Sequence, residues 1–338
     1  MRARNRLTTV IVVAVIFAAV AASVVYIAFQ ISPWPSALLL RHEFNKGGVA
    51  MARALGRHVP AGVAALTDQH YDPADGDAWL DVFAPASAGE RALPLVVWVH
   101  GGGWLSGAKA DVANYARIIA AKGYVVASLD YSLAPGARFP TPVRQINAAL
   151  RYLTANAKRL HLDPRRIVLA GDSAGAHLAA VAANAIAVPE YASAIGVVPA
   201  VRRAQLAGVV LFCGAYAMDR LPLAGPFGDI VRTMLWSFSG HADFRNDPAF
   251  ATASVLNFAG PDFPPAFLSA GNADPLAPQS VALADRLVAR GGRVERLFFP
   301  KDHQPPLRHE YQFDLDGVAG RQALAAMLGF LRRVTAAE

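Results

Sequence analysis

The chain contains 338 residues with a formal net charge of +7; 54% of the residues are hydrophobic and only 17% are charged. This length suits one large domain or two small ones, and the low charged fraction excludes an intrinsically disordered chain. The single cysteine, Cys213, excludes an intrachain disulfide and a cysteine-based zinc cluster.

The positive charge is concentrated near the N-terminus. Residues 1–58 hold seven basic residues and one acidic residue, so they carry six of the seven net charges. The rest of the chain is close to neutral and lacks the basic stripe, interleaved with aromatic residues, that is typical of nucleic-acid binding. We therefore expect no nucleic-acid partner.

The N-terminal part predicts a membrane anchor. Residues 7–31 carry no charge, and a helix of roughly 20 apolar residues can cross the hydrocarbon core of a bilayer. The arginines of the basic segment 1–6 place that segment in the cytoplasm and the rest of the chain outside it. The alternative is a cleaved signal peptide and a secreted protein. We favour the anchor, because a signal peptide has a shorter apolar region and the small residues at 21–23 lie inside the run rather than after it.

Residues 32–65 are interpreted as an amphipathic connector or part of a cap. Apolar and basic residues are mixed along this segment, so it can lie on the membrane surface as an amphipathic helix. The alternative is a connector packed on the globular part, because Gly47 and Gly48 are expected to interrupt a helix.

Residues 66–338 predict a single α/β domain. Short apolar runs, typical of strands covered on both faces, alternate with longer helical patterns. The predicted strands are residues 79–83, 95–99, 125–129, 167–170, 209–212, 266–269 and 294–299. The predicted helices are residues 112–122, 143–157, 174–187, 280–290 and 320–333. Residues 216–250 break this alternation, and a segment of this length between strands predicts a lid or binding loop.

The strongest motif is Gly-Asp-Ser-Ala-Gly at residues 171–175. It follows one predicted strand and opens a predicted helix, which is the context of a nucleophile elbow. Glycines are needed there because strand and helix approach closely at a sharp turn. Ser173 is therefore the candidate nucleophile, and the start of the helix behind it offers N–H groups to a developing anion.

A second motif, His-Gly-Gly-Gly-Trp at residues 100–104, follows the predicted strand 95–99. Three successive glycines let backbone N–H groups approach a substrate oxygen closely, as an oxyanion hole requires. We interpret His100 as a residue that orients this loop by hydrogen bonding.

With these motifs the chain resembles the hormone-sensitive-lipase-like branch of the α/β-hydrolases, which is marked by HGGG and GDSAG. Asp-Tyr-Ser-Leu-Ala-Pro at 130–135 with Phe139-Pro140, and Gly-Asn-Ala-Asp-Pro-Leu at 271–276, support the resemblance. It implies an α/β-hydrolase fold: a mostly parallel central sheet with helices on both faces and a cap or lid, here preceded by an N-terminal transmembrane helix.

The resemblance also implies a serine carboxylesterase or lipase with the chain order Ser, Asp, His. It assigns Gly102, Gly103 and the N–H of Ala174 as oxyanion donors. Ser173 would attack an ester carbonyl, and water would release the acyl-enzyme. The alternatives are an amidase, thioesterase or deacetylase on the same triad, or a binding module that keeps the fold without catalysis.

The acid and the base follow in the last third of the chain. Asp274 follows the predicted strand 266–269 and matches the family's acid, whereas Asp302 and Asp314 do not follow that strand. The family places its histidine in the loop before the last helix. The shorter spacing from Asp274 favours His303, and the aromatic segment that follows favours His309. We prefer His309 and keep His303 as the alternate base.

The sequence implies no cofactor and no metal, because it has no H-E-x-x-H motif, no P-loop and no dinucleotide fingerprint. The expected partners are a small-molecule or lipid ester substrate and, through the N-terminal helix, a membrane. The oligomeric state is left open.

Overall fold

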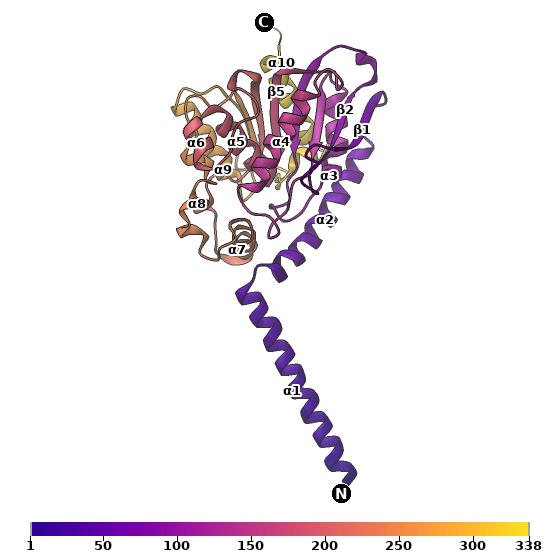
Figure 1. The fold of residues 1–338 in the computed structure, drawn as a ribbon, viewed down its shortest axis with the longest axis vertical. Helices are drawn as coiled ribbons and strands as arrows, with labels where there is room; N and C mark the ends of the chain where they lie inside the picture. The colour runs from indigo at the N-terminus through magenta and orange to yellow at the C-terminus, as the bar shows by residue number, and fades with distance from the viewer. Residues whose placement is uncertain (1, 337–338) are drawn as a thin grey trace.

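The computed structural model describes residues 2–336, with side chains from residue 9 onward, so the predicted basic segment 1–6 lies outside the residues whose side chains are described. Helix α1 (Arg2–Ile31) extends away from the body of the molecule as a single rod (Figure 1). Its segment Thr9–Ile31 has a mean hydropathy of 2.9 and is not buried anywhere in the structure. This helix is long and apolar enough to cross a membrane.

Helix α2 (Trp34–Gly56) follows α1 after a bend at Ser32 and Pro33, and it runs along the body. It continues through Gly47 and Gly48, where an interruption was expected. A Cβ atom at Gly48 would lie 2.9 Å from the carboxyl carbon of Asp111, so close packing on the body favours a glycine there. At Gly48 this tertiary contact offsets the helix cost of about 1 kcal/mol that a glycine carries.

An eight-stranded sheet forms the centre of the body. Its strands are β1 (Val63–His70), β2 (Trp79–Pro85), β3 (Leu93–Val99), β4 (Val125–Leu129), β5 (Leu162–Asp172), β6 (Leu206–Phe212), β7 (Ala266–Ala270) and β8 (Val294–Phe298). The strand order is β1-β2-β4-β3-β5-β6-β7-β8; β2 pairs in antiparallel fashion with both β1 and β4, and all the other neighbouring strands are parallel. The predicted α/β class with a mostly parallel sheet is therefore confirmed.

Strand β1 was missing from the sequence prediction, and it begins within the segment assigned to the connector. Residues 64–68 of this edge strand are exposed, and Asp68 and Gln69 interrupt its apolar pattern. The seven predicted strands all form: six of them contain a continuous buried run, whereas the edge strand β8 is only partly buried. Along β3, for example, Leu95 and Val97 pack on one face of the sheet, and Val96 and Trp98 pack on the other.

Helices cover both faces of the sheet. On one face lie α3 (Lys109–Ala120), α10 (Val318–Val334) and the end of α2, and on the other lie α4 (Thr141–Ala155), α5 (Ser173–Ala187) and α9 (Ala277–Ala289). The shorter helices are α6 (Pro189–Ala194), η1 (Ala86–Ala88), η2 (Arg203–Gln205), η5 (Val255–Asn257) and η6 (Tyr311–Phe313).

The segment 216–250 folds into helices although its sequence shows no clear periodicity. It contains η3 (Met218–Arg220), α7 (Gly225–Ser239), η4 (Phe244–Asn246) and α8 (Pro248–Ala251). Helix α7 buries Val231, Leu235 and Phe238 at helical spacing, but Gly225 and Pro226 at its start disguise the pattern. Figure 1 shows α7 beside the start of α2, at the end of the body nearest α1.

Candidate active site

Ser173 lies at the turn between β5 and α5. Its φ of 51° is unusual for a residue with a side chain, which is the strain typical of a nucleophile elbow. A Cβ atom at Gly175 would collide with the carbonyl groups of Val99 and His100, and one at Gly171 would collide with the backbone of Gly175. Glycines at 171 and 175 therefore let strand, turn and helix pack together, and this packing holds Ser173 at the carboxyl edge of the sheet.

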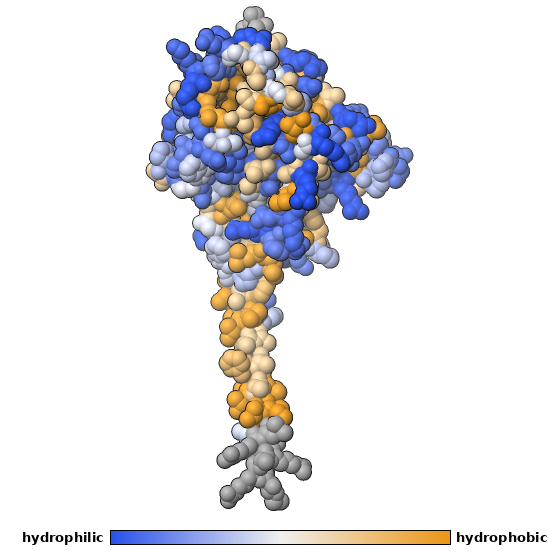
Figure 2. Space-filling view, turned by 90° about the vertical axis from the view of Figure 1, so that its right-hand side faces the viewer, coloured by the Kyte–Doolittle hydropathy of each residue, from blue (hydrophilic) through white to orange (hydrophobic). Residues whose placement is uncertain are grey.

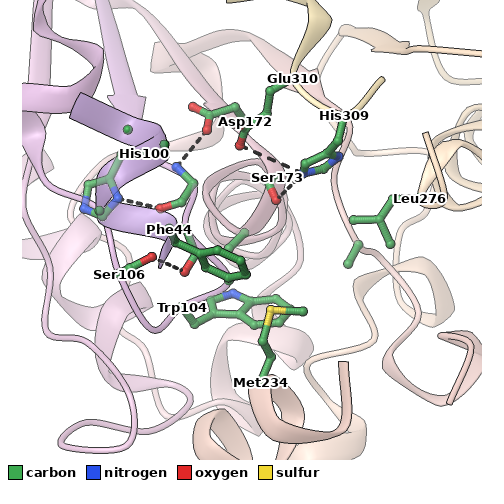
Figure 3. A pocket seen from close by; sticks show the side chains of 18 of the residues that line it. Phe44, His100, Trp104, Ser106, Asp172, Ser173, Met234, Leu276, His309 and Glu310 are labelled. Carbon is green, nitrogen blue, oxygen red and sulfur yellow. Dashed lines mark hydrogen bonds and ion pairs between the residues drawn. The ribbon is translucent and has the colours of Figure 1, made fainter. Parts of the chain in front are cut away.

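The structure brings His309 and Asp274 together with Ser173. The serine hydroxyl lies 2.8 Å from Nε2 of His309, and Nδ1 of His309 lies 2.9 Å from Oδ2 of Asp274. The other carboxylate oxygen of Asp274 accepts a hydrogen bond of 2.8 Å from the N–H of Leu276. The Asp274 side chain is completely buried, so its orientation is fixed from both sides. The three side chains form one chain of hydrogen bonds, of which Figure 3 shows the part that joins Ser173 to His309.

His303, the alternate base, lies elsewhere. Its ring packs against Phe299, with the ring centroids 4.8 Å apart, and its carbonyl oxygen accepts a hydrogen bond from Asn272. In the described part of the chain, its imidazole makes no hydrogen bond to Ser173 or Asp274.

The glycine loop after β3 lies next to Ser173. Gly102 and Gly103 have φ angles of 109° and 62°, which a residue with a side chain rarely adopts. Within residues 2–336 their N–H groups donate no hydrogen bond, and both glycines line the same pocket as Ser173 and Ala174. Ala174 occupies the first turn of α5, where helix N–H groups have no intrahelical partner. Three N–H donors are thus available beside the serine.

Asp172 fixes the glycine loop to the elbow. Its buried carboxylate accepts hydrogen bonds of 2.7 Å from Nε1 of Trp98 and 2.8 Å from the N–H of Gly101. His100 adds a second constraint, because its ring lies 2.7 Å from the carbonyl oxygen of Gly101. Burial lowers the pKa of His100 to about 4, so this ring is neutral at pH 7. Sequence reasoning missed the role of Asp172, although its place inside the elbow motif was a signal.

Glu310 is a second acidic group that sequence reasoning missed. It has a φ of 61°, and its carboxylate lies 3.9 Å from Nε2 of His309. Burial acts to lower the pKa of His309, but the interactions of its ring with Cys213, Asp274 and Glu310 outweigh burial and raise this pKa well above its usual value. Burial and the charge of Glu310 also raise the pKa of Asp172.

Removing the charge of Glu310 should change the pH dependence of the reaction. His309 can accept a proton only when it is neutral, so kcat/KM falls as the pH falls through the pKa of His309. Glu310→Gln removes a charge that stabilises the imidazolium, so this pKa falls and the acidic limb of kcat/KM moves to lower pH. The pH profile with a soluble p-nitrophenyl ester measures the shift.

The matched control for this prediction is Glu190→Gln, since Glu190 is exposed on α6, far along the chain from these loops. Its acidic limb should coincide with that of the wild type. An unchanged limb in Glu310→Gln would contradict a role of Glu310 in setting the pKa of His309.

One group of side chains could bind a metal ion. The ligand atoms of Cys213, Asp274 and His309 lie within 4.8 Å of one another. Nδ1 of His309 is already bonded to Asp274, and burial raises the pKa of the Cys213 thiol. A metal ion at this place would therefore have to displace a proton from the thiol and break the bond between Asp274 and His309.

A cavity of about 380 Å³ opens in front of Ser173. Its walls are mostly apolar, and they come from the glycine loop, from α2, from α7 and from the loop after β7. Figure 3 shows Phe44, Trp104 and Met234 gathered on one side of Ser173 and Leu276 on the other. The site can thus hold an uncharged apolar group next to a serine, an imidazole and three N–H donors.

This fold and this site define an α/β-hydrolase. Residues 80–287 match the model of the BD-FAE family. The chain is 31% identical to carboxylesterase NlhH of Mycobacterium tuberculosis over 71% of this chain and 74% of that protein, and 29% identical to an esterase of Gibberella moniliformis over 74% and 79%. The solved structure of esterase B from Lactobacillus rhamnosis covers 89% of this chain and 96% of its own, with a TM-score of 0.75 and 26% identity.

The chain therefore belongs to the BD-FAE family, and its relatives are hormone-sensitive-lipase-like esterases, which confirms the resemblance inferred from the sequence. It is a carboxylic ester hydrolase.

Proposed function

We propose that the protein is a membrane-anchored serine carboxylesterase or lipase that uses Ser173, His309 and Asp274 as its catalytic triad. The observation that carries the proposal is the continuous chain of hydrogen bonds from the Ser173 hydroxyl through both ring nitrogens of His309 to the buried Asp274 carboxylate. This arrangement matches the roles that the three residue types play in serine hydrolases.

In this mechanism Ser173 Oγ attacks the ester carbonyl while Nε2 of His309 takes the hydroxyl proton. Asp274 keeps the proton of His309 on Nδ1 and stabilises the imidazolium that forms. The imidazolium then gives its proton to the departing alcohol. A water molecule, activated by His309 in the same way, attacks the acyl-enzyme and releases the carboxylic acid.

The negative oxygen of each tetrahedral intermediate needs hydrogen-bond donors. We propose that the N–H groups of Gly102, Gly103 and Ala174 supply them, because all three residues line the pocket with Ser173. Removing one such donor typically costs about 10²–10³ in kcat. Asp172 supports this site from behind, since it anchors the loop through Gly101.

The anchor is part of the proposal. Helix α1 offers a 23-residue apolar segment, Thr9–Ile31, with no buried part. This segment has no polar face that could contact water, as a helix packed on the core of a soluble domain would have. The arginines that precede it favour a cytoplasmic N-terminus and a catalytic body outside the cytoplasm.

The proposal is tested by active-site labelling. A fluorophosphonate probe forms a covalent bond with an activated serine, so the full-length wild type should be labelled on Ser173 and should hydrolyse p-nitrophenyl butyrate. Ser173→Ala should lose both the label and the hydrolysis. As a control, Ser132→Ala alters a serine that contacts Asp77 and Gln145 instead, and it should keep the label. Equal hydrolysis by wild type and Ser173→Ala would overturn the proposal.

A further inference from the structure

Helix α2, which follows α1, builds part of the cavity in front of Ser173. The inner face of α2 contributes Phe44, Gly48 and Met51 to the cavity in front of Ser173. The same face buries Ala37 and Leu55 against the body. Arg41 secures it with hydrogen bonds to the carbonyl oxygens of Leu105 and Ala134. Helix α2 is therefore a fixed wall of the active site.

Helix α7 forms the opposing wall. It lines the cavity with Phe227, Ile230 and Met234. A Cβ atom at Gly103 would collide with the sulfur of Met234 and lie 3.3 Å from the ring of Phe44, so α2 and α7 converge over the glycine loop. Figure 3 shows Phe44 of α2 and Met234 of α7 on the same side of Ser173. The two helices together enclose the side of the cavity that lies away from the sheet.

The outer face of α2 is apolar where it adjoins the anchor. Trp34, Leu38 and Leu39 are exposed by 44%, 50% and 61%. Only Ser32 and Pro33 separate this helix from α1. Figure 2, which views the molecule from the side of α2, shows hydrophobic residues continuing from the rod into the lower part of the body. This apolar surface, Trp34, Leu38 and Leu39, is thus continuous with the proposed membrane span.

The charges further along α2 suit a membrane surface. Beyond Leu39 the outer face carries the exposed residues His42, Lys46 and Arg53. Basic residues that follow an apolar patch on an interfacial helix contact anionic headgroups. At 1.5 Å per residue, Leu39 lies within about 12 Å of the end of α1, and Phe44 within about 20 Å. The rim of the cavity is therefore close to the depth at which lipid ester bonds occur, at the boundary of hydrocarbon and headgroups.

The rim of the cavity also lies on the side of the proposed membrane. Exposed Glu43 and Gly47 of α2 line the cavity, and a Cβ atom at Gly47 would meet nothing within 4 Å. Figure 1 shows α7 and the start of α2 together at the end of the body from which α1 leaves. A chain entering here from the membrane meets open space first and the apolar walls of the cavity next.

We propose that the substrate is a lipid ester resident in the bilayer, and that its acyl chain reaches Ser173 from the membrane side, between α2 and α7, while Trp34, Leu38 and Leu39 dip into the bilayer. This inference rests on the proposed function and on the proposed anchor. The chemistry is the ester hydrolysis described above: water supplies the hydroxyl group of the released fatty acid and the proton of the released alcohol.

The test compares two substrates in full-length protein reconstituted into phosphatidylcholine vesicles. p-Nitrophenyl butyrate reports the soluble reaction, and p-nitrophenyl palmitate held in the vesicles reports the bilayer-resident reaction. The double variant Leu38→Gln with Leu39→Gln should lower hydrolysis of the palmitate by about tenfold or more, because it removes the apolar surface that inserts. Its kcat/KM for the butyrate should stay within about twofold of the wild type.

The matched control is Val198→Gln with Val288→Gln. These residues are exposed by 83% and 50%, comparable to Leu38 and Leu39. Val288 lies near the end of α9, and Val198 lies beside the middle of α4, where its carbonyl oxygen accepts a hydrogen bond from Asn147; neither residue lines the cavity. This control should leave both rates within about twofold. Unchanged palmitate hydrolysis in the α2 double variant would overturn the proposal that the substrate enters from the membrane, and it would leave the proposed esterase function unaffected. Absence of butyrate hydrolysis in the wild type would instead overturn the proposed function.

A second measurement decides the case in which the α2 variant loses both activities. Cys213 is the only cysteine and is completely buried, so a thiol-reactive fluorophore will attach to a cysteine introduced on the surface. Lipids with brominated acyl chains should quench a fluorophore on Leu39→Cys strongly and one on Val288→Cys weakly. Equal quenching at the two positions would overturn the proposal. So would a fluorophore on Leu39→Cys that is already shielded from water without vesicles, because a second copy of the chain or a partner would then cover this surface.

Discussion

Replacing His309 by alanine is expected to lower kcat by about 10⁶-fold. The imidazole lies 2.8 Å from the Ser173 hydroxyl and 2.9 Å from Asp274, so its removal leaves the serine without a base and the acid without a partner. Binding of the ester depends mainly on the apolar walls of the cavity, and KM should therefore change little. Initial rates over a range of p-nitrophenyl butyrate concentrations separate the two constants.

The control for this prediction is His303→Ala. The ring of His303 packs against Phe299 and is not bonded to the serine or the acid. Its removal should leave kcat within about twofold. A large loss in His303→Ala alone would assign the base to His303, and modest losses in both variants would contradict the proposed triad altogether.

The sequence identifies the candidate nucleophile because the features that place it are local. The apolar run of β5, the two glycines and the alanine-rich start of α5 are adjacent in the chain, and they are sufficient to predict a sharp strand–turn–helix elbow with Ser173 at its tip. The glycine loop is predictable for the same reason, since it directly follows a buried strand.

The choice between the two histidines depends on information that is not local. Both lie in an irregular segment between β8 and η6, where no periodicity fixes the direction of a side chain. The path of this segment is set by tertiary contacts: the side-chain oxygen of Asn272 accepts a hydrogen bond from the N–H of Leu307, and the carbonyl oxygen of Leu307 accepts one from the N–H of Ala273. These contacts bind the segment to the loop after β7, and they bring His309 to Asp274.

Other differences from the sequence prediction have similar causes. Helix α2 continues through two glycines because packing against Asp111 favours a residue without a side chain at position 48. Helix α7 is not predicted from the sequence because it begins with Gly225 and Pro226, residues that usually disfavour a helix. The influence of Glu310 on the pKa of His309 is not predictable from the sequence, because it depends on the folded position of both residues. Only the folded chain brings the carboxylate of Glu310 to 3.9 Å from the imidazole of His309.

The Asp274→Asn variant is expected to lower kcat by about 10⁴-fold while leaving the fold intact. One oxygen of Asp274 accepts a hydrogen bond from the N–H of Leu276 and the other lies 2.9 Å from Nδ1 of His309. In the asparagine variant, the amide oxygen must face Leu276, because two donors cannot face each other. The amide NH₂ then faces Nδ1, which forces the imidazole proton onto Nε2. His309 can no longer accept the proton of Ser173.

Asp302→Asn is the matched control, because Asp302 is exposed in the same region and was the nearest alternative acid along the chain. It should keep kcat within about twofold. The tautomer itself can be measured: the low-field proton resonance of Nδ1–H, expected in the wild type, should be absent in Asp274→Asn. If that variant kept kcat within tenfold of the wild type, the buried carboxylate could not be what holds His309 in its basic tautomer, and the acid of the proposed triad would have to be sought elsewhere.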